Sequence, residues 1–445
     1  MQVTIPRLVI AGTQSGCGKT TIASGLMAAL TEMGIRVQPF KTGPDFIDPS
    51  HHSGICGRVS RNLDPFMMGE AGVLRAFTTA SDGADIAVIE GAMGLFDGIE
   101  GTDTASTAHV ARILRAPVIL VVDASASSRS VHAVIHGFRT FDPRIRIAGV
   151  IFNRIATAKH REMIASKELV PALGWIPSRR GSEVKSRHLG LVMGHESGAM
   201  GTFGSIVRES CDIDAILDTA RSTPVLETGP ASAEGSVHHR AVIGVARDEA
   251  FCFYYQDNLD RLVRVGAEIR YFSPIRDPLP DVDALYLGGG YPELHCRDLE
   301  GSPCRHAIRD MTGRGMPVLA ECGGLMYLCR SVLADREYRM ADVLPARAEM
   351  TSSIQALGYV KGRYDGISGL WAGTVACRGH EFHYSRVECD PGARFAIRLT
   401  TGNGIRDRND GLFEKNAIGT YTHAYFSDTF CRRFVAAAQD FRRDR

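Results

Sequence analysis

The stretch Gly12-Thr-Gln-Ser-Gly-Cys-Gly-Lys-Thr20 decides the fold of the first half of the chain. It follows the apolar run 8–11 and precedes a helical pattern of apolar residues that extends to Met33. A strand, a glycine-rich turn and a helix therefore follow one another. Glycines let such a turn close tightly, so its N–H groups and the positive end of the helix point at one spot. That spot suits a phosphate chain.

This turn predicts nucleotide binding, although turns rich in glycine also occur without a ligand. Lys19 would reach the outer phosphates and the Thr20 hydroxyl a magnesium ion, as in a P-loop. The loop is one residue longer than the usual spacing, but Gly-x-Gly-Lys-Thr-Thr in this setting favours a nucleotide. The candidate nucleotide-binding residues here are Gly12, Thr13, Ser15, Gly16, Gly18, Lys19, Thr20 and Thr21.

Length and composition predict a protein of two or three domains that acts on small molecules. The chain has 445 residues, of which 44% are hydrophobic and 23% charged, and its net charge is +1. No global charge favours nucleic acid or a membrane surface. Eleven cysteines without a Cys-x-x-Cys pair, after an N-terminus that does not resemble a signal peptide, indicate reduced thiols and a cytoplasmic location.

Acidic residues follow two further predicted strands of this half. The strand at 36–40 leads into Lys41, Asp45 and Asp48, and the apolar strand at 86–89 ends at Glu90. Ligands of open α/β sheets bind at such carboxyl ends, so these carboxylates are candidates for the phosphate-transfer and magnesium site. Asp48 suits the start of a helix equally well. For Glu90 a magnesium role is favoured over capping.

Apolar strands at 117–122 and 145–152 complete a parallel sheet covered on both faces. Asn153 follows the second of them and is a candidate for hydrogen-bonding a purine base, although an ordinary loop asparagine is the default interpretation. Farther on, a basic stretch from Arg179 to His188, which includes Arg187, suits a substrate rich in carboxylates. It also suits a solvated face.

A change of composition predicts two domains. Residues 222–240 are rich in Pro, Gly, Ala, Ser and Glu, which is typical of a linker. We therefore expect an ATP-dependent domain at 1–221 and a second α/β domain at 241–445. The second domain begins with strands at 241–246, 268–272 and 283–287.

Cys322 lies between an apolar strand and a helix that begins with glycines, which predicts a nucleophile elbow with sulfur in place of oxygen. The helix N-terminus should lower the pKa of this thiol, and the Gly323 amide should face an oxyanion. The glycines Gly289 and Gly290 are candidates for the second amide. His423, after the apolar stretch 417–422, is one candidate base, and His380 and His383 are rivals.

The order of eight motifs resembles the cobyrinic or hydrogenobyrinic acid a,c-diamide synthases, glutamine-dependent amidotransferases of the cobalamin pathway. The motifs span nearly the whole chain, and six of them lie outside the P-loop and the cysteine turn. Those six are Lys41-x-Gly-Pro-Asp-x-Ile-Asp-Pro, Glu90-Gly-x-Met-Gly-Leu-Phe-Asp-Gly, Ser186-Arg-His-Leu-Gly-Leu, Ala250-Phe-x-Phe-Tyr-Tyr, Gly288-Gly-Gly-Tyr-Pro-Glu and Gly379-His-Glu-Phe-His-Tyr-Ser.

This resemblance implies the fold and the chemistry of both halves. The first half is expected to share the fold of dethiobiotin synthetase, which has the same longer loop, and to use ATP with Mg²⁺. The second is expected to be a class I glutaminase with Cys322 as nucleophile and His423 as base. Asp45, Asp48 and Glu90 would serve the magnesium and phosphate-transfer site. By analogy, we expect a homodimer whose substrates are ATP, glutamine and a corrinoid acid.

One departure and two alternatives stay open. Class I glutaminases commonly carry a glutamate two residues after the histidine, whereas this chain reads His423-Ala-Tyr425, and Glu381 is a weak candidate for the missing acid. A nickel-sirohydrochlorin a,c-diamide synthase would treat a similar macrocycle. A P-loop ATPase switch of the partitioning type would have no use for Cys322.

Overall fold

In the computed structural model the chain divides into two compact units, Met1–Ser232 and Ala233–Arg445. The structure describes residues 2–167, 169–178, 200–227, 241–365 and 374–445. The predicted linker at 222–240 lies partly outside these ranges and stays a prediction. Within it, however, β9 (Leu226–Glu227) pairs with β1 (Gln2–Val3) in a separate two-stranded sheet. This part of the predicted linker therefore belongs to the first unit.

The first unit is built on a seven-stranded sheet with the order β4-β3-β5-β2-β6-β7-β8, in which every pair is parallel. The predicted strands all form. The strands are β2 (Arg7–Gly12), β3 (Val37–Thr42), β4 (Arg61–Leu63), β5 (Ile86–Glu90), β6 (Val118–Asp123), β7 (Ile147–Ile155) and β8 (Ala172–Pro177).

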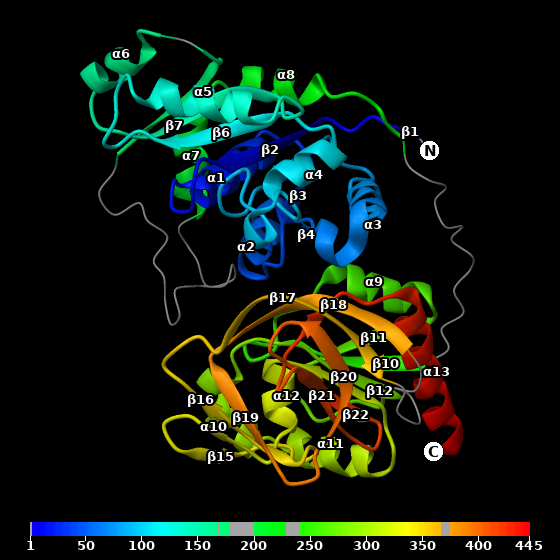
Figure 1. Cartoon of the computed structure of the whole chain (residues 1–445). Helices are drawn as coiled ribbons and strands as arrows, with labels where there is room; N and C mark the ends of the chain where they lie inside the picture. Colours follow the sequence, from blue (N-terminus) through cyan, green and yellow to red (C-terminus); the bar gives the residue numbers. More distant parts are fainter. Residues whose placement is uncertain (1, 168, 179–199, 228–240, 366–373) are drawn as a thin grey trace. The chain divides into compact units, whose positions relative to one another are not determined.

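Helices cover both faces of this sheet, as the continuous apolar strands predict. Alternate residues of β2 separate the two cores, because Leu8 and Ile10 pack with α1, α7 and α8, whereas Val9 and Ala11 pack with α3, α4 and α5. The helices, labelled in Figure 1, are α1 (Lys19–Glu32), α2 (Ile47–Cys56), α3 (Pro65–Ala80), α4 (Thr107–Ile113), α5 (Val131–Phe141), α6 (Ala158–Ala165), α7 (Met200–Ser210) and α8 (Ile213–Arg221).

The second unit contains a ten-stranded sheet that is parallel in one half and antiparallel in the other. Its order is β11-β10-β12-β13-β22-β21-β20-β17-β18-β23. The parallel half consists of β11 (Ala267–Phe272), β10 (Ala241–Ala246), β12 (Ala284–Leu287), β13 (Val318–Glu321) and β22 (Ala417–Thr420). The antiparallel half consists of β21 (Asn409–Glu414), β20 (Arg394–Thr401), β17 (Ala356–Asp365), β18 (Thr374–His383) and β23 (His423–Ala424).

A four-stranded sheet and several helices complete this unit. The small sheet has the order β15-β14-β16-β19, formed by Glu337–Arg339, Ser331–Leu333, Ala346–Met350 and Ser385–Cys389. The helices are α9 (Gln256–Arg264), α10 (Cys296–Gly301), α11 (Cys304–Gly313), α12 (Gly323–Leu328) and α13 (Asp428–Asp444). Buried side chains form separate cores on the two faces of the large sheet.

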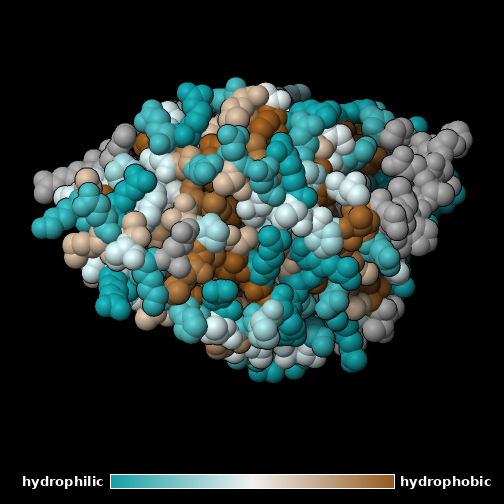
Figure 2. Space-filling view, turned by 90° about the horizontal axis from the view of Figure 1, so that it is seen from above, coloured by the Kyte–Doolittle hydropathy of each residue, from teal (hydrophilic) through white to brown (hydrophobic). Residues whose placement is uncertain are grey.

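The surface carries hydrophobic side chains in patches between hydrophilic ones, as the face drawn in Figure 2 shows. Among the helices that the structure describes, none combines the length and the hydrophobicity needed to cross a membrane.

Candidate active sites

The P-loop lies between β2 and α1, at the carboxyl end of the parallel sheet. Gly18, the N-cap of α1, has φ 97°, a conformation that side chains rarely adopt. A Cβ at Gly18 would lie 2.1 Å from Nδ2 of Asn153. That Nδ2 donates to the Cys17 carbonyl at 2.9 Å, so Asn153, which lies in β7, holds the P-loop in place. A purine contact by Asn153 stays a prediction.

The residues of the loop leave its backbone accessible to a ligand. Ser15 and Gly16 are exposed, whereas Lys19 is buried and its Nζ lies 3.5 Å from the Gln14 carbonyl. Burial lowers the pKa of Lys19, and the positive charge of Lys41 adds to this effect. A buried lysine at the start of the helix is suited to an anionic phosphate.

Lys41 joins the predicted acidic residues into one cluster. Its Nζ lies 2.5 Å from Oδ2 of Asp48, 2.9 Å from Oε1 of Glu90 and 3.7 Å from Oδ2 of Asp45. The Thr20 hydroxyl donates to Oε1 of Glu90 at 2.6 Å. The structure thus brings the two strand-end motifs and the P-loop together at the carboxyl edge of the sheet.

Burial and charge fix the ionisation of this cluster. Burial opposes the charge of Lys41, but the Glu90, Asp48 and Asp45 carboxylates raise its pKa above the ordinary value. Burial likewise opposes the charge of Glu90, but Lys41 and His52 hold the pKa of that carboxyl well below its usual range. His52, which sequence reasoning missed, lies with Nε2 2.7 Å from Oε2 of Glu90. Glu90 and Lys41 are therefore a buried ion pair.

Asp45 and Asp48 have different structural positions at the start of α2. Oδ1 of Asp45 accepts hydrogen bonds from the N–H groups of residues 47 and 48, at 2.8 and 3.2 Å. Asp48 lies inside the first turn, where its carboxylate contacts Lys41. The alternative that Asp48 merely caps a helix is therefore wrong, because Asp45 performs the capping.

The donor set of this cluster is of the kind that Mg²⁺ prefers. The hydroxyl of Thr20 and the carboxylates of Asp48 and Glu90 are hard oxygen ligands, and Mg²⁺ commonly uses one or two such groups together with phosphate oxygens and water. No group of three or more His, Cys, Asp or Glu arranged around a common point occurs among the described residues. A magnesium ion held by these oxygens stays a prediction. The predicted substrate residues Arg187 and His188 lie outside the described residues.

Cys322 forms the predicted elbow in the second unit. It connects β13 to α12 with φ 48° and ψ −97°, a strained conformation for a residue with a side chain. Its N–H donates to the Thr420 carbonyl at 2.7 Å, which ties the turn to the end of β22. His423 follows that strand.

The glycine loop 288–290 lies beside both Cys322 and His423. A Cβ at Gly289 would lie 2.4 Å from Cε1 of His423, and a Cβ at Gly323 would lie 3.2 Å from the N of Gly290. The loop is held in place by hydrogen bonds from the N–H of Gly324 to the Gly288 carbonyl, at 3.1 Å, and from residues 252 and 253 to the Gly289 carbonyl. The nucleophile turn, the histidine and the predicted oxyanion amides therefore meet on one loop.

The expectation that the helix N-terminus lowers the pKa of the Cys322 thiol is wrong. Burial, together with the carboxylate of Glu293, raises the pKa of Cys322 to about 12, and the Gly323 amide opposes this only in part. Burial also lowers the pKa of His423 well below its usual value, and His380 and His383 add to the effect. Both groups are therefore neutral at rest, as a thiol and an imidazole. The helix N-terminus is too weak to outweigh burial.

Glu321, which sequence reasoning missed, connects the two catalytic candidates. It precedes Cys322, and its Oε1 accepts from the N–H of Ala424 at 2.9 Å, directly after His423. Its Oε2 accepts from the hydroxyl of Tyr286 at 2.8 Å. Glu381, the weak candidate for a third triad member, instead accepts from the N–H groups of Asn403 and Gly404.

Two family profiles match the two units. Residues 8–192 match the CobQ/CobB/MinD/ParA nucleotide binding domain, and residues 242–429 match the CobB/CobQ-like glutamine amidotransferase domain. A cobyrinate a,c-diamide synthase of Methanosarcina acetivorans is 41% identical over 95% of this chain and 92% of its own. One of Archaeoglobus fulgidus is 42% identical over 98% of both chains. A hydrogenobyrinate a,c-diamide synthase of Streptomyces coelicolor is 39% identical over 97% of both.

The chain belongs to the family of cobyrinate and hydrogenobyrinate a,c-diamide synthases. The predicted fold, a P-loop nucleotide-binding domain followed by a glutamine amidotransferase domain, is confirmed. An a,c-diamide synthase with these two domains is a glutamine-dependent, amide-forming ligase, so the prediction of an enzyme is confirmed as well.

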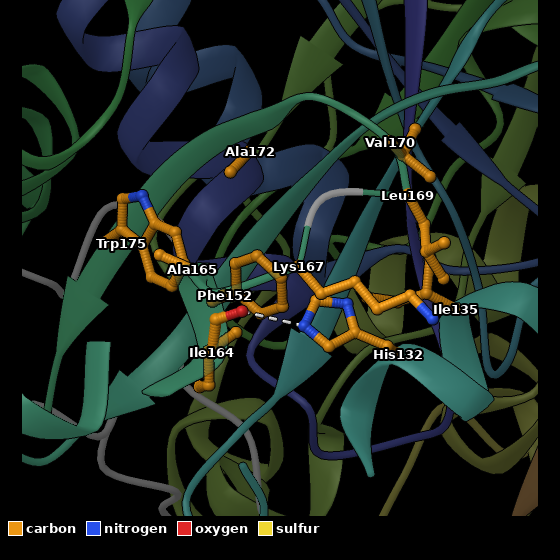
Figure 3. Close-up of a pocket in the computed structure, with 10 residues that line it drawn as sticks. All are labelled: His132, Ile135, Phe152, Ile164, Ala165, Lys167, Leu169, Val170, Ala172 and Trp175. Atoms are coloured by element: carbon orange, nitrogen blue, oxygen red, sulfur yellow. Dashed lines mark hydrogen bonds between the residues drawn. The ribbon is translucent and has the colours of Figure 1, made fainter. Parts of the chain in front are cut away.

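A cavity of about 110 Å³ lies in the first unit. Figure 3 shows its walls, in which His132 approaches the Ile164 carbonyl through Nε2 at 2.8 Å. Phe152 and Trp175 stack there with ring centroids 4.6 Å apart. None of the predicted site residues that the structure describes lines this cavity.

Proposed function

We propose that the chain catalyses the ATP- and glutamine-dependent amidation of the a and c acetate side chains of cobyrinate or hydrogenobyrinate. The observation that carries this proposal is the presence, in one chain of this family, of the Lys41 cluster at a P-loop and of a cysteine elbow beside His423. The first site suits phosphate transfer and the second suits glutamine hydrolysis. The similarity to cobyrinate and hydrogenobyrinate a,c-diamide synthases indicates the substrate.

In the first unit the acetate must be activated, because oxide is a poor leaving group. A carboxylate oxygen attacks the γ-phosphorus of ATP, ADP leaves, and an acyl phosphate forms. Lys19 would neutralise the transferring phosphoryl group, and Thr20, Asp48 and Glu90 would hold Mg²⁺. When bound, Mg²⁺ would offset the negative charge of the phosphate groups. Ammonia then attacks the acyl carbon, and inorganic phosphate leaves.

In the second unit Cys322 would supply that ammonia. Its sulfur attacks the side-chain amide carbon of glutamine while His423 takes the thiol proton and passes it to the departing ammonia. Water then hydrolyses the thioester to glutamate. Because both groups are neutral at rest, the proton transfer to His423 accompanies the attack on glutamine.

Separating the two nitrogen sources tests this proposal. Cys322→Ala should abolish synthesis with glutamine and preserve it with ammonium chloride, whereas Lys19→Ala should abolish both. Cys431→Ala, at another buried cysteine, and Lys159→Ala, at an exposed lysine of α6, are matched controls. An equal loss with both nitrogen sources in Cys322→Ala would contradict two separate sites.

The substrate requires its own comparison. Cobyrinate, hydrogenobyrinate and nickel-sirohydrochlorin would be incubated side by side with ATP and glutamine, and the products scored by mass. We expect a mass loss of about 1 Da for each carboxylate converted to an amide, first in a monoamide and then in a diamide. Amidation of nickel-sirohydrochlorin alone would overturn the corrinoid assignment. The predicted homodimer and cytoplasmic location stay predictions, which light scattering and cell fractionation would test.

A further inference from the structure

His380 lies directly opposite His423 in the sheet. In the antiparallel pair of β18 and β23, Gly379 pairs with Ala424 and His380 with His423. The two imidazole rings are stacked, with centroids 4.9 Å apart and planes 18° apart. A Cβ at Gly379 would lie 2.1 Å from the carbonyl oxygen of His423, so only glycine permits this close approach of the strands. The backbone is thus arranged to bring the rings together.

His380 is itself fixed from the opposite side. The hydroxyl of Tyr255 lies 2.8 Å from Nδ1 of His380, and both side chains are buried. The adjoining helix α9 also holds the strand of His423, because Nδ2 of Asn258 donates to the Ala424 carbonyl at 2.7 Å. A tyrosine, a histidine and the proposed base therefore form a continuous row.

Three groups near His423 that could orient a histidine make hydrogen bonds to other parts of the described chain. Tyr425, at the position where the family of class I glutaminases commonly has glutamate, accepts a hydrogen bond from Arg261 at 2.8 Å. Glu381 binds the 403–404 turn, and Glu321 binds the backbone N–H of Ala424 rather than the ring. The ring of His423 lies beside the Gly289 backbone and the face of His380, and the ring of Phe253 is 6.4 Å away between centroids.

We propose that His380 is a positioning residue that holds the imidazole plane of His423 by stacking, with Tyr255 as its anchor. This inference rests on the proposed role of His423 as the base of the glutaminase. An imidazole on a strand still rotates about its last side-chain torsion, and a general base must reach the reacting proton within hydrogen-bond distance. Stacked aromatic rings resist such rotation. A third group that orients the base is a general requirement of nucleophile–base pairs, and here a ring face supplies it.

Three substitutions separate stacking from the other roles that His380 could have. His380→Ala removes the ring, His380→Phe preserves a ring without nitrogen, and Tyr255→Phe removes only the hydroxyl that anchors His380. The full-length enzyme would be assayed for kcat and KM with glutamine and, in parallel, for synthesis with ammonium chloride. The ammonia-dependent rate serves as the control for folding within each variant.

We expect His380→Ala to lower the glutamine-dependent kcat by about 10-fold to 100-fold, because misorientation of a catalytic group costs rates of this order. The KM for glutamine should change less than about 3-fold, since His380 only orients the base. His380→Phe should recover most of the lost rate, and Tyr255→Phe should lie between wild type and His380→Ala.

Three results would overturn this inference. They are an unchanged kcat in His380→Ala, a loss in His380→Phe as large as that in His380→Ala, and an equal loss of the ammonia-dependent rate. The second result would indicate that a ring nitrogen takes part, and the third a general structural role. A different result would contradict the proposed glutaminase itself. In that case the enzyme with the single substitution Cys322→Ala would still use glutamine.

Discussion

Replacing the buried acid Glu321 by glutamine should make the enzyme more stable than wild type, and this advantage should grow as the pH rises. Burial is the largest influence on this carboxyl and raises its pKa from 4.5 to about 8, against the opposing hydrogen bonds from Ala424 and Tyr286. The folded protein therefore keeps a proton on Glu321 that the unfolded chain gives up above pH 4.5. Glutamine has the shape of the protonated acid, so its Oε1 can accept from Ala424 and its Nε2 can donate to Tyr286.

The magnitude follows from the shift in pKa. A folded-state pKa above the unfolded value gives stability that is complete below pH 4.5 and is lost as the pH rises toward about 8. Each pH unit in this window costs about 1.4 kcal/mol, so the loss approaches roughly 5 kcal/mol above pH 8. Glu321→Gln does not titrate and escapes this loss. The advantage of the variant should therefore be small at pH 4.5 to 5, grow with pH, and level off above pH 8.

The assay is urea unfolding of wild type and Glu321→Gln from pH 5 to 9, followed by circular dichroism. The two proteins share every other titratable group, so the difference in free energy of unfolding isolates Glu321. If the two units unfold separately, the difference should occur only in the transition of the second unit. A difference that is constant from pH 5 to 9 would refute the reasoning, because Glu321 would then titrate alike in the folded and unfolded chains.

Three further substitutions test other contacts. Gly18→Ala should weaken nucleotide binding by about 10-fold or more in calorimetry, because the new Cβ meets Asn153, whereas Gly137→Ala in the open surface of α5 should not. Gly289→Ala should lower glutamine hydrolysis by about 10-fold or more while ammonia-dependent synthesis continues, since its Cβ displaces His423, and Gly313→Ala is the matched control. Lys41→Met should cost roughly 3–5 kcal/mol in urea unfolding by leaving Glu90 without its cation, and adding Glu90→Gln should recover part of this.

Most of the parallel strands could be predicted from the sequence because they are short, continuous apolar runs. The runs at 86–89, 117–122 and 241–246 all became buried strands. β8 was missed because its apolar residues Leu173, Trp175 and Ile176 precede a basic stretch that hides the boundary. The antiparallel strands β17 to β21 were also missed. Such strands mix polar with apolar residues, as in the segment from Val360 through Arg363 to Tyr364, so no continuous apolar run marks them.

The site could be predicted where chemistry and local turn geometry coincide. The glycines beside Lys19 and Cys322 mark both turns directly. That the motifs of Lys41 and Glu90 serve one site could be expected, because each follows a strand that ends at the same sheet edge, but their ion pair could not. The partners of His423 could not be found in this way, because the contact with His380 depends on the register of β18 and β23. Likewise, the sequence shows that Glu321 precedes Cys322. It does not show that burial raises the pKa of the Cys322 thiol by more than the helix N-terminus lowers it.

The neutral thiol of Cys322 has a consequence for how this enzyme endures oxidative stress. Peroxides attack the thiolate, and burial keeps Cys322 in the thiol form at neutral pH. A nucleophile kept as a thiolate would be open to conversion to sulfenic acid during every idle interval. In the mechanism proposed above, the sulfur loses its proton only when glutamine is bound. The enzyme without glutamine should therefore resist oxidation by peroxide and keep its activity until glutamine is supplied again.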